Sequence, residues 1–168
     1  SPEEEKKRYL LHKNSLSQEG YIRFLSQLWE PAKKHLSTTM RGLDYGCGPT
    51  PVLCSLVQQD GFQIDGYDPY FHPSSPSPPY DFILSTETVE HFKRPLASWK
   101  HIQSLLKPSG KLFVLTDPLD NLKDFPQWYY HKDPTHVSFY QPQTFFWIAK
   151  TFQWQVTFLS RRVIYFKG

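Results

Sequence analysis

Hydrophobic positions along the chain follow two different periods. Residues 21–29, YIRFLSQLW, place their apolar side chains on one helical stripe, and Pro31 is expected to end this helix. Shorter apolar runs of strand length follow, separated by further stretches with helical periodicity. The pattern predicts strands over residues 41–46, 62–71, 80–85 and 111–116, helices beginning at Pro51 and Pro95, and a helix over residues 145–152.

The C-terminal part of the chain contains a pair of strands. The runs WQVTFLS and RVIYFK are separated by little more than Arg161, and so short a link forces antiparallel pairing. The earlier strands alternate with helices, which is typical of parallel pairing. The sequence therefore predicts an α/β fold with a doubly wound, mostly parallel sheet and a C-terminal antiparallel strand. Residues 117–140 show no clear period and are predicted to form a long loop.

Size and charge narrow the class of protein. A chain of 168 residues with 39% hydrophobic content is long enough for one domain, and a second complete domain is not expected. The net charge of +3 is spread over small basic groups, so we expect no dedicated nucleic-acid surface. Absence of a long apolar stretch or signal pattern argues against a membrane protein. Cys47 and Cys54 match neither a disulfide nor a zinc spacing, which indicates a reducing, cytoplasmic location.

The stretch GLDYGCGPTP, residues 42–51, joins a predicted strand to a predicted helix. Gly46 and Gly48 can adopt positive φ and let a ligand approach the backbone beside a helix N-terminus. About twenty residues later, Asp68 ends the next predicted strand, where a carboxylate can accept both hydroxyls of a ribose. The glycines alone would also fit a plain tight turn, but together with Asp68 they predict a nucleoside-containing cofactor.

The residue at the position of the third glycine of the motif distinguishes between possible cofactors. A dinucleotide turn has the pattern G-x-G-x-x-G, whose third glycine packs close to the strand. Pro51 occupies this place here, which disfavours a pyrophosphate and hence a nicotinamide-dependent oxidoreductase.

Four blocks in a fixed order carry a family resemblance: GLDYGCGPTP, GYDPYF, YDFILSTETVEHFKRP and LLKPSGKLFVLT. The chain resembles the class I, Rossmann-like methyltransferases that depend on S-adenosylmethionine (SAM), and in particular small bacterial members of unassigned substrate. The likeness runs over about residues 40–166. It implies one domain over residues 1–168, with cap helices in 1–36, a Rossmann-like core in 37–168 and a lid or acceptor loop in 117–140.

The resemblance also implies a cofactor site for SAM, with S-adenosylhomocysteine (SAH) as the product. Three groups of residues match the family's first motif, its ribose acid with the neighbouring adenine contact, and the segment lining the methionine part. They are Asp44, Gly46, Cys47 and Gly48; Asp68 with Tyr70 or Phe71; and Ser85, Thr86 and Glu87.

The chain departs from the family pattern at two places. Thr50 replaces the third glycine of the common G-x-G-x-G turn, which makes the turn stiffer. The span between Asp68 and Tyr80 is too short for the usual helix and strand, so we expect one strand and one helix at the sheet edge to be missing. This shortening bears directly on how adenine would be recognised.

Two histidines are candidates for a general base. His91 lies four positions after Glu87 and so shares a helical face with it, although a packing role for His91 is the stronger reading. His136 lies in the aromatic loop 117–140, where Asp133 can orient it, and we predict that this loop forms the acceptor pocket. The loop's aromatic residues could instead cover the sheet edge.

Metal binding is not expected from the sequence. His131, Asp133 and His136 lack the rest of a ligand set, and no cysteine or second carboxylate cluster stands beside them. At the N-terminal end, His12 together with Tyr9 and Asn14 is predicted to close over the methionine end of SAM, and a solvated leader is the alternative.

The predicted function is transfer of the SAM methyl group to a small-molecule acceptor. A SAM-binding protein without catalysis is the alternative. The block NPPY or DPPY, typical of enzymes that methylate amino groups, is replaced after residue 84 by STET, which favours an oxygen or carbon acceptor. The oligomeric state is not predicted, and the start at Ser1 is compatible with a piece of a longer chain.

Overall fold

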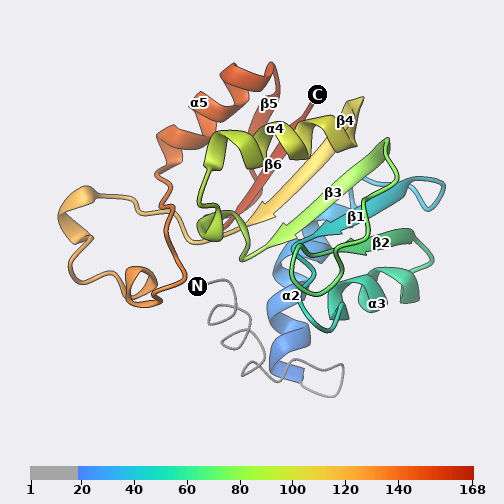
Figure 1. Ribbon diagram of the computed structural model, residues 1–168, viewed down its shortest axis with the longest axis horizontal. Coiled ribbons are helices and arrows are strands. Elements are labelled where there is room, and N and C mark those ends of the chain that lie inside the picture. Colours follow the sequence, from blue (N-terminus) through green and yellow to red (C-terminus); the bar gives the residue numbers. More distant parts are fainter. Residues whose placement is uncertain (1–18) are drawn as a thin grey trace.

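A computed structural model describes residues 19–168, in which helices and strands alternate as expected (Figure 1). The strands are β1 (Arg41–Tyr45), β2 (Gln63–Tyr67), β3 (Tyr80–Thr86), β4 (Leu106–Leu115), β5 (Gln155–Phe158) and β6 (Val163–Lys167). The α-helices are α2 (Glu19–Lys33), α3 (Val52–Gln59), α4 (Pro95–Leu105) and α5 (Pro142–Phe152). Short 3-10 helices are η1 (Val89–His91), η2 (Leu122–Asp124) and η3 (Tyr129–Lys132).

The six strands form one sheet in the order β2-β1-β3-β4-β6-β5. Strands β2, β1, β3 and β4 pair in parallel, whereas β6 pairs antiparallel with both β4 and β5. The predicted doubly wound sheet with a C-terminal antiparallel strand is therefore confirmed. Strand order reverses at β1, which has β2 on one side and β3 on the other. In open α/β sheets this is the place where ligands bind, beyond the carboxyl ends of the strands.

Helices cover both faces of the sheet: α4 and α5 lie on one face, and α2 and α3 on the other (Figure 1). Each face has its own hydrophobic cluster, centred on Trp99 and Phe145 under α4 and α5, and on Trp29 and Phe82 under α2 and α3. Strands β1 and β3 and the second half of β4 are thus buried on both sides, as expected for the inner strands of such a sheet, whereas the edge strand β2 is largely exposed. The segment after β4 leaves this sandwich at the carboxyl edge and extends away from it.

Three predicted boundaries were wrong, the first being that of the strand over residues 62–71, which ends at Tyr67. Helix α2 continues past Pro31 to Lys33, because Trp29 and Ala32 on either side of the proline are fully buried and hold the last turn in place. Strand β4 begins at Leu106 and not at residue 111. Its pairing with β3 jumps from Leu106 to Lys111, so the residues KPSG form an irregularity within the strand and do not precede it.

The sheet edge beside β2 is shortened, as predicted. Residues 68–79 form no helix and no strand, only an isolated bridge between Asp68 and His72, and β2 is the outermost strand of its side. Each helix within residues 19–168 is too short or too polar to cross a membrane.

Candidate functional site

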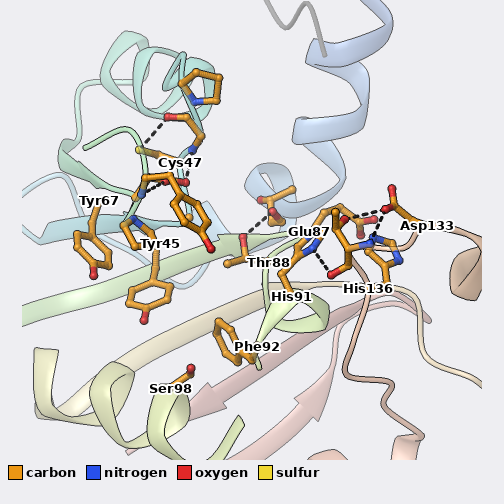
Figure 2. A pocket seen from close by; sticks show the side chains of 18 of the residues that line it. Tyr45, Cys47, Tyr67, Glu87, Thr88, His91, Phe92, Ser98, Asp133 and His136 are labelled. Carbon is orange, nitrogen blue, oxygen red and sulfur yellow. Dashed lines mark hydrogen bonds between the residues drawn. The ribbon is translucent and has the colours of Figure 1, made fainter. Parts of the chain in front are cut away.

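One cavity of about 850 Å³ opens at the carboxyl ends of β1, β2 and β3. Its walls come from the loops that follow these three strands, from α2 and from the segment 129–136. Figure 2 shows two groups of side chains facing each other across it: Tyr45, Cys47 and Tyr67 on one side, and Glu87, His91, Asp133 and His136 on the other. The cavity therefore has two halves of different chemistry, joined around Thr88.

The glycine turn after β1 forms the first half. Gly46 and Gly48 have φ angles of 87° and 68°, in the left-handed region that favours glycine. The amides of Gly46 and Cys47 donate hydrogen bonds to the Tyr67 carbonyl at 2.8 and 3.1 Å, which ties the turn to the end of β2. A Cβ at Gly46 would meet Thr88 at 2.4 Å, whereas a Cβ at Gly48 would meet nothing within 4 Å. Gly46 thus permits close packing, and Gly48 leaves the floor of the cavity open.

Asp68 lies at the end of β2 and lines the same half. Its carboxylate accepts hydrogen bonds from the backbone N–H groups of Gly48 at 3.1 Å, Tyr70 at 2.8 Å and Phe71 at 3.1 Å. A carboxylate offers about four lone-pair sites, so one further hydroxyl can be accepted without displacing a backbone partner. Tyr70 lines the cavity and Phe71 does not, which favours Tyr70 as the wall for an adenine ring.

Two residues predicted to contact the cofactor lie behind the cavity wall. Asp44 is 2% exposed and accepts a hydrogen bond from the Cys54 thiol at 3.7 Å, under helix α3. Burial raises the pKa of Asp44 to about 7, with a smaller contribution from the charge of Asp68. Ser85 is fully buried within β3. Neither side chain lines the cavity, because strand alternation turns both into the sheet layers; their contact with the cofactor stays a prediction.

The segment after β3 supplies Thr86 and Glu87 to the cavity, as expected. The Thr86 hydroxyl is buried and has no hydrogen-bond partner among residues 19–168. Glu87 adopts a positive φ of 46°, which is uncommon for a residue with a side chain. Its Oε1 accepts a hydrogen bond from Arg162 at 2.9 Å. Burial raises the pKa of Glu87, and the Arg162 charge acts against this shift.

A buried polar cluster lies beneath the second half of the cavity. The Tyr130 hydroxyl donates to Glu90 Oε1 and lies 3.1 Å from both Glu87 Oε2 and Thr116 Oγ1. Thr116 also donates to Glu90 Oε2 at 3.2 Å. Glu90 is completely buried, and burial together with the Glu87 charge raises its pKa to about 8. The cluster joins the loop 117–140 to the end of β3.

His91 and His136 line the cavity with ring centroids 4.8 Å apart. His91 Nδ1 donates to the Thr135 carbonyl at 3.0 Å, and His136 Nδ1 donates to the Tyr130 carbonyl at 2.7 Å. A neutral ring that donates from Nδ1 carries its lone pair on Nε2. Both rings are thus anchored through Nδ1 to the backbone of the loop 117–140.

The Tyr130 carbonyl accepts the hydrogen bond of His136 Nδ1, and an orienting role for Asp133 stays a prediction. The Asp133 carboxylate accepts hydrogen bonds from the Thr135 backbone and hydroxyl at 2.9 and 2.7 Å, and it shapes the turn that carries His136. His12, the remaining predicted site residue, lies outside the described residues.

The aromatic residues of the loop 117–140 divide between two roles. Tyr129 and Tyr130 line the cavity. Phe125, Trp128 and Phe139 pack against one another instead, with ring centroids 5.4 to 6.2 Å apart. The loop thus combines a cavity wall with a small hydrophobic cluster of its own.

Several cavity residues escaped the sequence reasoning. Tyr21 and Phe24 come from α2, and burial raises the pKa of Tyr21 to about 12. Tyr45 and Tyr67 end β1 and β2 with rings 5.2 Å apart. Arg162, which holds Glu87, lies in the turn between β5 and β6. The antiparallel direction of β6 was the available signal, since it brings this turn back to the carboxyl edge of the parallel strands.

The chain belongs to the methyltransferase domain family, whose model matches residues 14–158. This family and the fold together define the class I methyltransferases that the sequence resembles. Among curated proteins, no sequence gives a significant match.

Solved structures share the fold at low sequence identity. A 1,6-didemethyltoxoflavin-N1-methyltransferase from Burkholderia thailandensis, solved with its substrate and SAH, is 12% identical with a TM-score of 0.64, over 86% of this chain and 78% of that one. The YcgJ protein of Bacillus subtilis is 15% identical with a TM-score of 0.59, over 82% and 70% of the two chains. A SAM-dependent methyltransferase from Archaeoglobus fulgidus is 20% identical with a TM-score of 0.54, over 82% and 76%.

Proposed function

We propose that the protein transfers the methyl group of SAM to a small-molecule acceptor. The observation that carries this proposal is the continuity of one cavity from the glycine turn to the histidines. The turn with Asp68 suits a nucleoside, and the half with His91 and His136 suits an acceptor that must be aligned and deprotonated.

The first half of the cavity fits SAM. Asp68 has acceptor capacity for a ribose hydroxyl, Tyr70 offers a wall for adenine, and the space at Gly48 lets the ligand approach the backbone. The buried Thr86 hydroxyl, which lacks a partner among the described residues, would bond to the methionine part. SAM itself supplies a methyl group already activated on a sulfonium.

The second half holds and prepares the acceptor. The aromatic rings of Tyr129 and Tyr130 exclude water and fix its orientation. The Nε2 atoms of His91 and His136 can accept the proton of an acceptor hydroxyl, because the Nδ1 atoms of both rings donate to backbone carbonyls.

Isothermal titration of the purified protein with SAM, SAH and NAD in parallel tests the cofactor assignment. We expect binding of SAM and SAH and none of NAD. Asp68→Ala removes a charged acceptor and should weaken SAM binding by about 2–3 kcal/mol. Asp65→Ala, three residues earlier in β2 and paired with Arg41 outside the cavity, is the matched control. Normal SAM binding by Asp68→Ala would show the ribose assignment to be wrong.

Methyl transfer itself is tested by incubating the protein with isotopically labelled SAM and a panel of hydroxyl and amine metabolites. Labelled product is expected with hydroxyl acceptors. SAM binding without transfer to any acceptor class would instead favour a non-catalytic SAM-binding protein.

A further inference from the structure

Glu90, His91 and His136 form a compact group of potential metal ligands at the wall of the acceptor half. One carboxylate oxygen and one nitrogen of each ring all lie within 4.8 Å of one another. The group is assembled from two distant segments, since Glu90 and His91 belong to η1 and His136 follows η3. The two rings line the cavity, and Glu90 is fully buried behind them.

The surroundings of the three side chains resemble the outer shell of a metal site. Each histidine donates from Nδ1 to a backbone carbonyl, which is how metal-binding imidazoles are usually oriented. The two oxygens of Glu90 accept from Tyr130 and Thr116, and each oxygen keeps a second lone pair. The three potential metal ligands are therefore held in place by hydrogen-bond partners that would not themselves bind the ion.

The local charge also favours a cation. Glu87 and Glu90 both approach the Tyr130 hydroxyl, and a hydroxyl has only one proton to donate. Arg162 pairs with Glu87 at 2.9 Å, and no ion pair to Glu90 exists within residues 19–168. Two neighbouring carboxyl groups thus share one guanidinium, and a divalent ion beside Glu90 would take the place of a proton there.

We propose that Glu90, His91 and His136 bind one divalent transition metal ion. Two imidazoles and one carboxylate suit Zn²⁺, Co²⁺, Fe²⁺ or Mn²⁺ better than Mg²⁺ or Ca²⁺, which prefer oxygen ligands. Ligand atoms at about 2.1 Å from a common ion lie about 3.4 Å apart, so the side chains, whose atoms lie within 4.8 Å of one another, must close in by up to about 1.4 Å.

Three protein ligands would leave room for a further ligand on the ion, and the two histidines line the cavity from which it would come. The ligand class that would complete the coordination is an acceptor with a hydroxyl or carbonyl oxygen. This assignment rests on the proposed function, because it places the ion in the acceptor half. With the ion bound, the ring nitrogens would no longer act as bases; an acceptor hydroxyl on the ion would have a lowered pKa and would lose its proton to water.

The test uses the full chain, stripped with a chelator and titrated with Co²⁺ by visible absorption and with Zn²⁺ by calorimetry. One ion per chain is expected, and loss of a ligand in His91→Ala or His136→Ala should weaken binding at least about 100-fold. His35→Ala, an exposed histidine that packs against Tyr165, should bind normally. Glu90→Gln, which keeps the shape of the side chain, is the variant to use where a histidine variant fails to fold.

Three outcomes overturn the proposal. They are no binding by the wild type, equal binding by all the variants, and a near-ultraviolet Co²⁺–thiolate band that would place the ion at Cys47 and Cys54. A failure of the proposed function can be told apart from a failure of the metal proposal. Calorimetry measures SAM binding by the metal-free protein, and this binding depends only on the cofactor half of the cavity.

Discussion

The Tyr130 hydroxyl donates a hydrogen bond to the buried carboxylate of Glu90 and so fastens the loop 117–140 to the end of β3. Tyr130 is 4% exposed, and its ring lies 4.2 Å from that of His136. One side chain therefore fixes both the buried acid and the position of a cavity histidine.

Tyr130→Phe should lower the free energy of unfolding by about 1–3 kcal/mol, because Glu90 Oε1 loses its donor in a buried setting. Urea denaturation measures this loss, and limited proteolysis should show earlier cleavage near residues 129–136. Tyr129→Phe is the matched control, since Tyr129 is 59% exposed and should change stability by less than about 0.5 kcal/mol. Equal stability of both variants would contradict a fastening role for Tyr130.

Gly46→Ala and Gly48→Ala should differ, although both residues have positive φ. The left-handed conformation costs either alanine roughly 1–2 kcal/mol. Only the Cβ at Gly46 also collides with Thr88, which should add about 1–3 kcal/mol. Thermal unfolding gives the comparison, and calorimetry should show weaker SAM binding by Gly48→Ala, whose Cβ enters the cavity. Equal destabilisation would mean that the turn can move away from Thr88.

Asp44 makes stability depend on pH, because burial raises its pKa from 3.8 to about 7. Between these values the folded protein keeps a proton that the unfolded chain has released, so the free energy of unfolding falls as pH rises from about 4 to 7. The full loss above pH 7 is roughly 4 kcal/mol.

Asp44→Asn removes this dependence and should be more stable than the wild type at pH 8 but similar at pH 4. Urea denaturation across this pH range measures it, with the exposed Asp124→Asn as the control that keeps the wild-type slope. An unchanged slope in Asp44→Asn would show that another group titrates.

Much of the cofactor half could be predicted from the sequence. The turn with Gly46 and Gly48 lies between a strand and a helix that are neighbours along the chain, and Asp68 follows one strand later. Local patterns fix such an arrangement, because strand, turn and helix each have their own signature. The burial of Asp44 behind the cavity wall was not predicted, since the sequence does not show toward which layer a strand residue points.

The acceptor half was less accessible to prediction. His91 and His136 were noted separately, but their meeting beside Glu90 depends on how the loop 117–140 folds back over η1. That path has no periodicity and is set by tertiary contacts such as the bond from Val137 N to the Glu90 carbonyl at 2.9 Å. Arg162 was missed for a similar reason, because a hairpin turn carries no local sign of its partner across the sheet.

Three hydrogen bonds from backbone N–H groups hold the Asp68 carboxylate in place before any ligand binds. They join the turn at Gly48 and the turn at Tyr70 into one rigid piece that already has its shape. A ligand that binds there finds a preorganised site, so little binding free energy is spent on ordering the chain. The glycine turn and Asp68 can therefore take up a nucleoside without first changing shape.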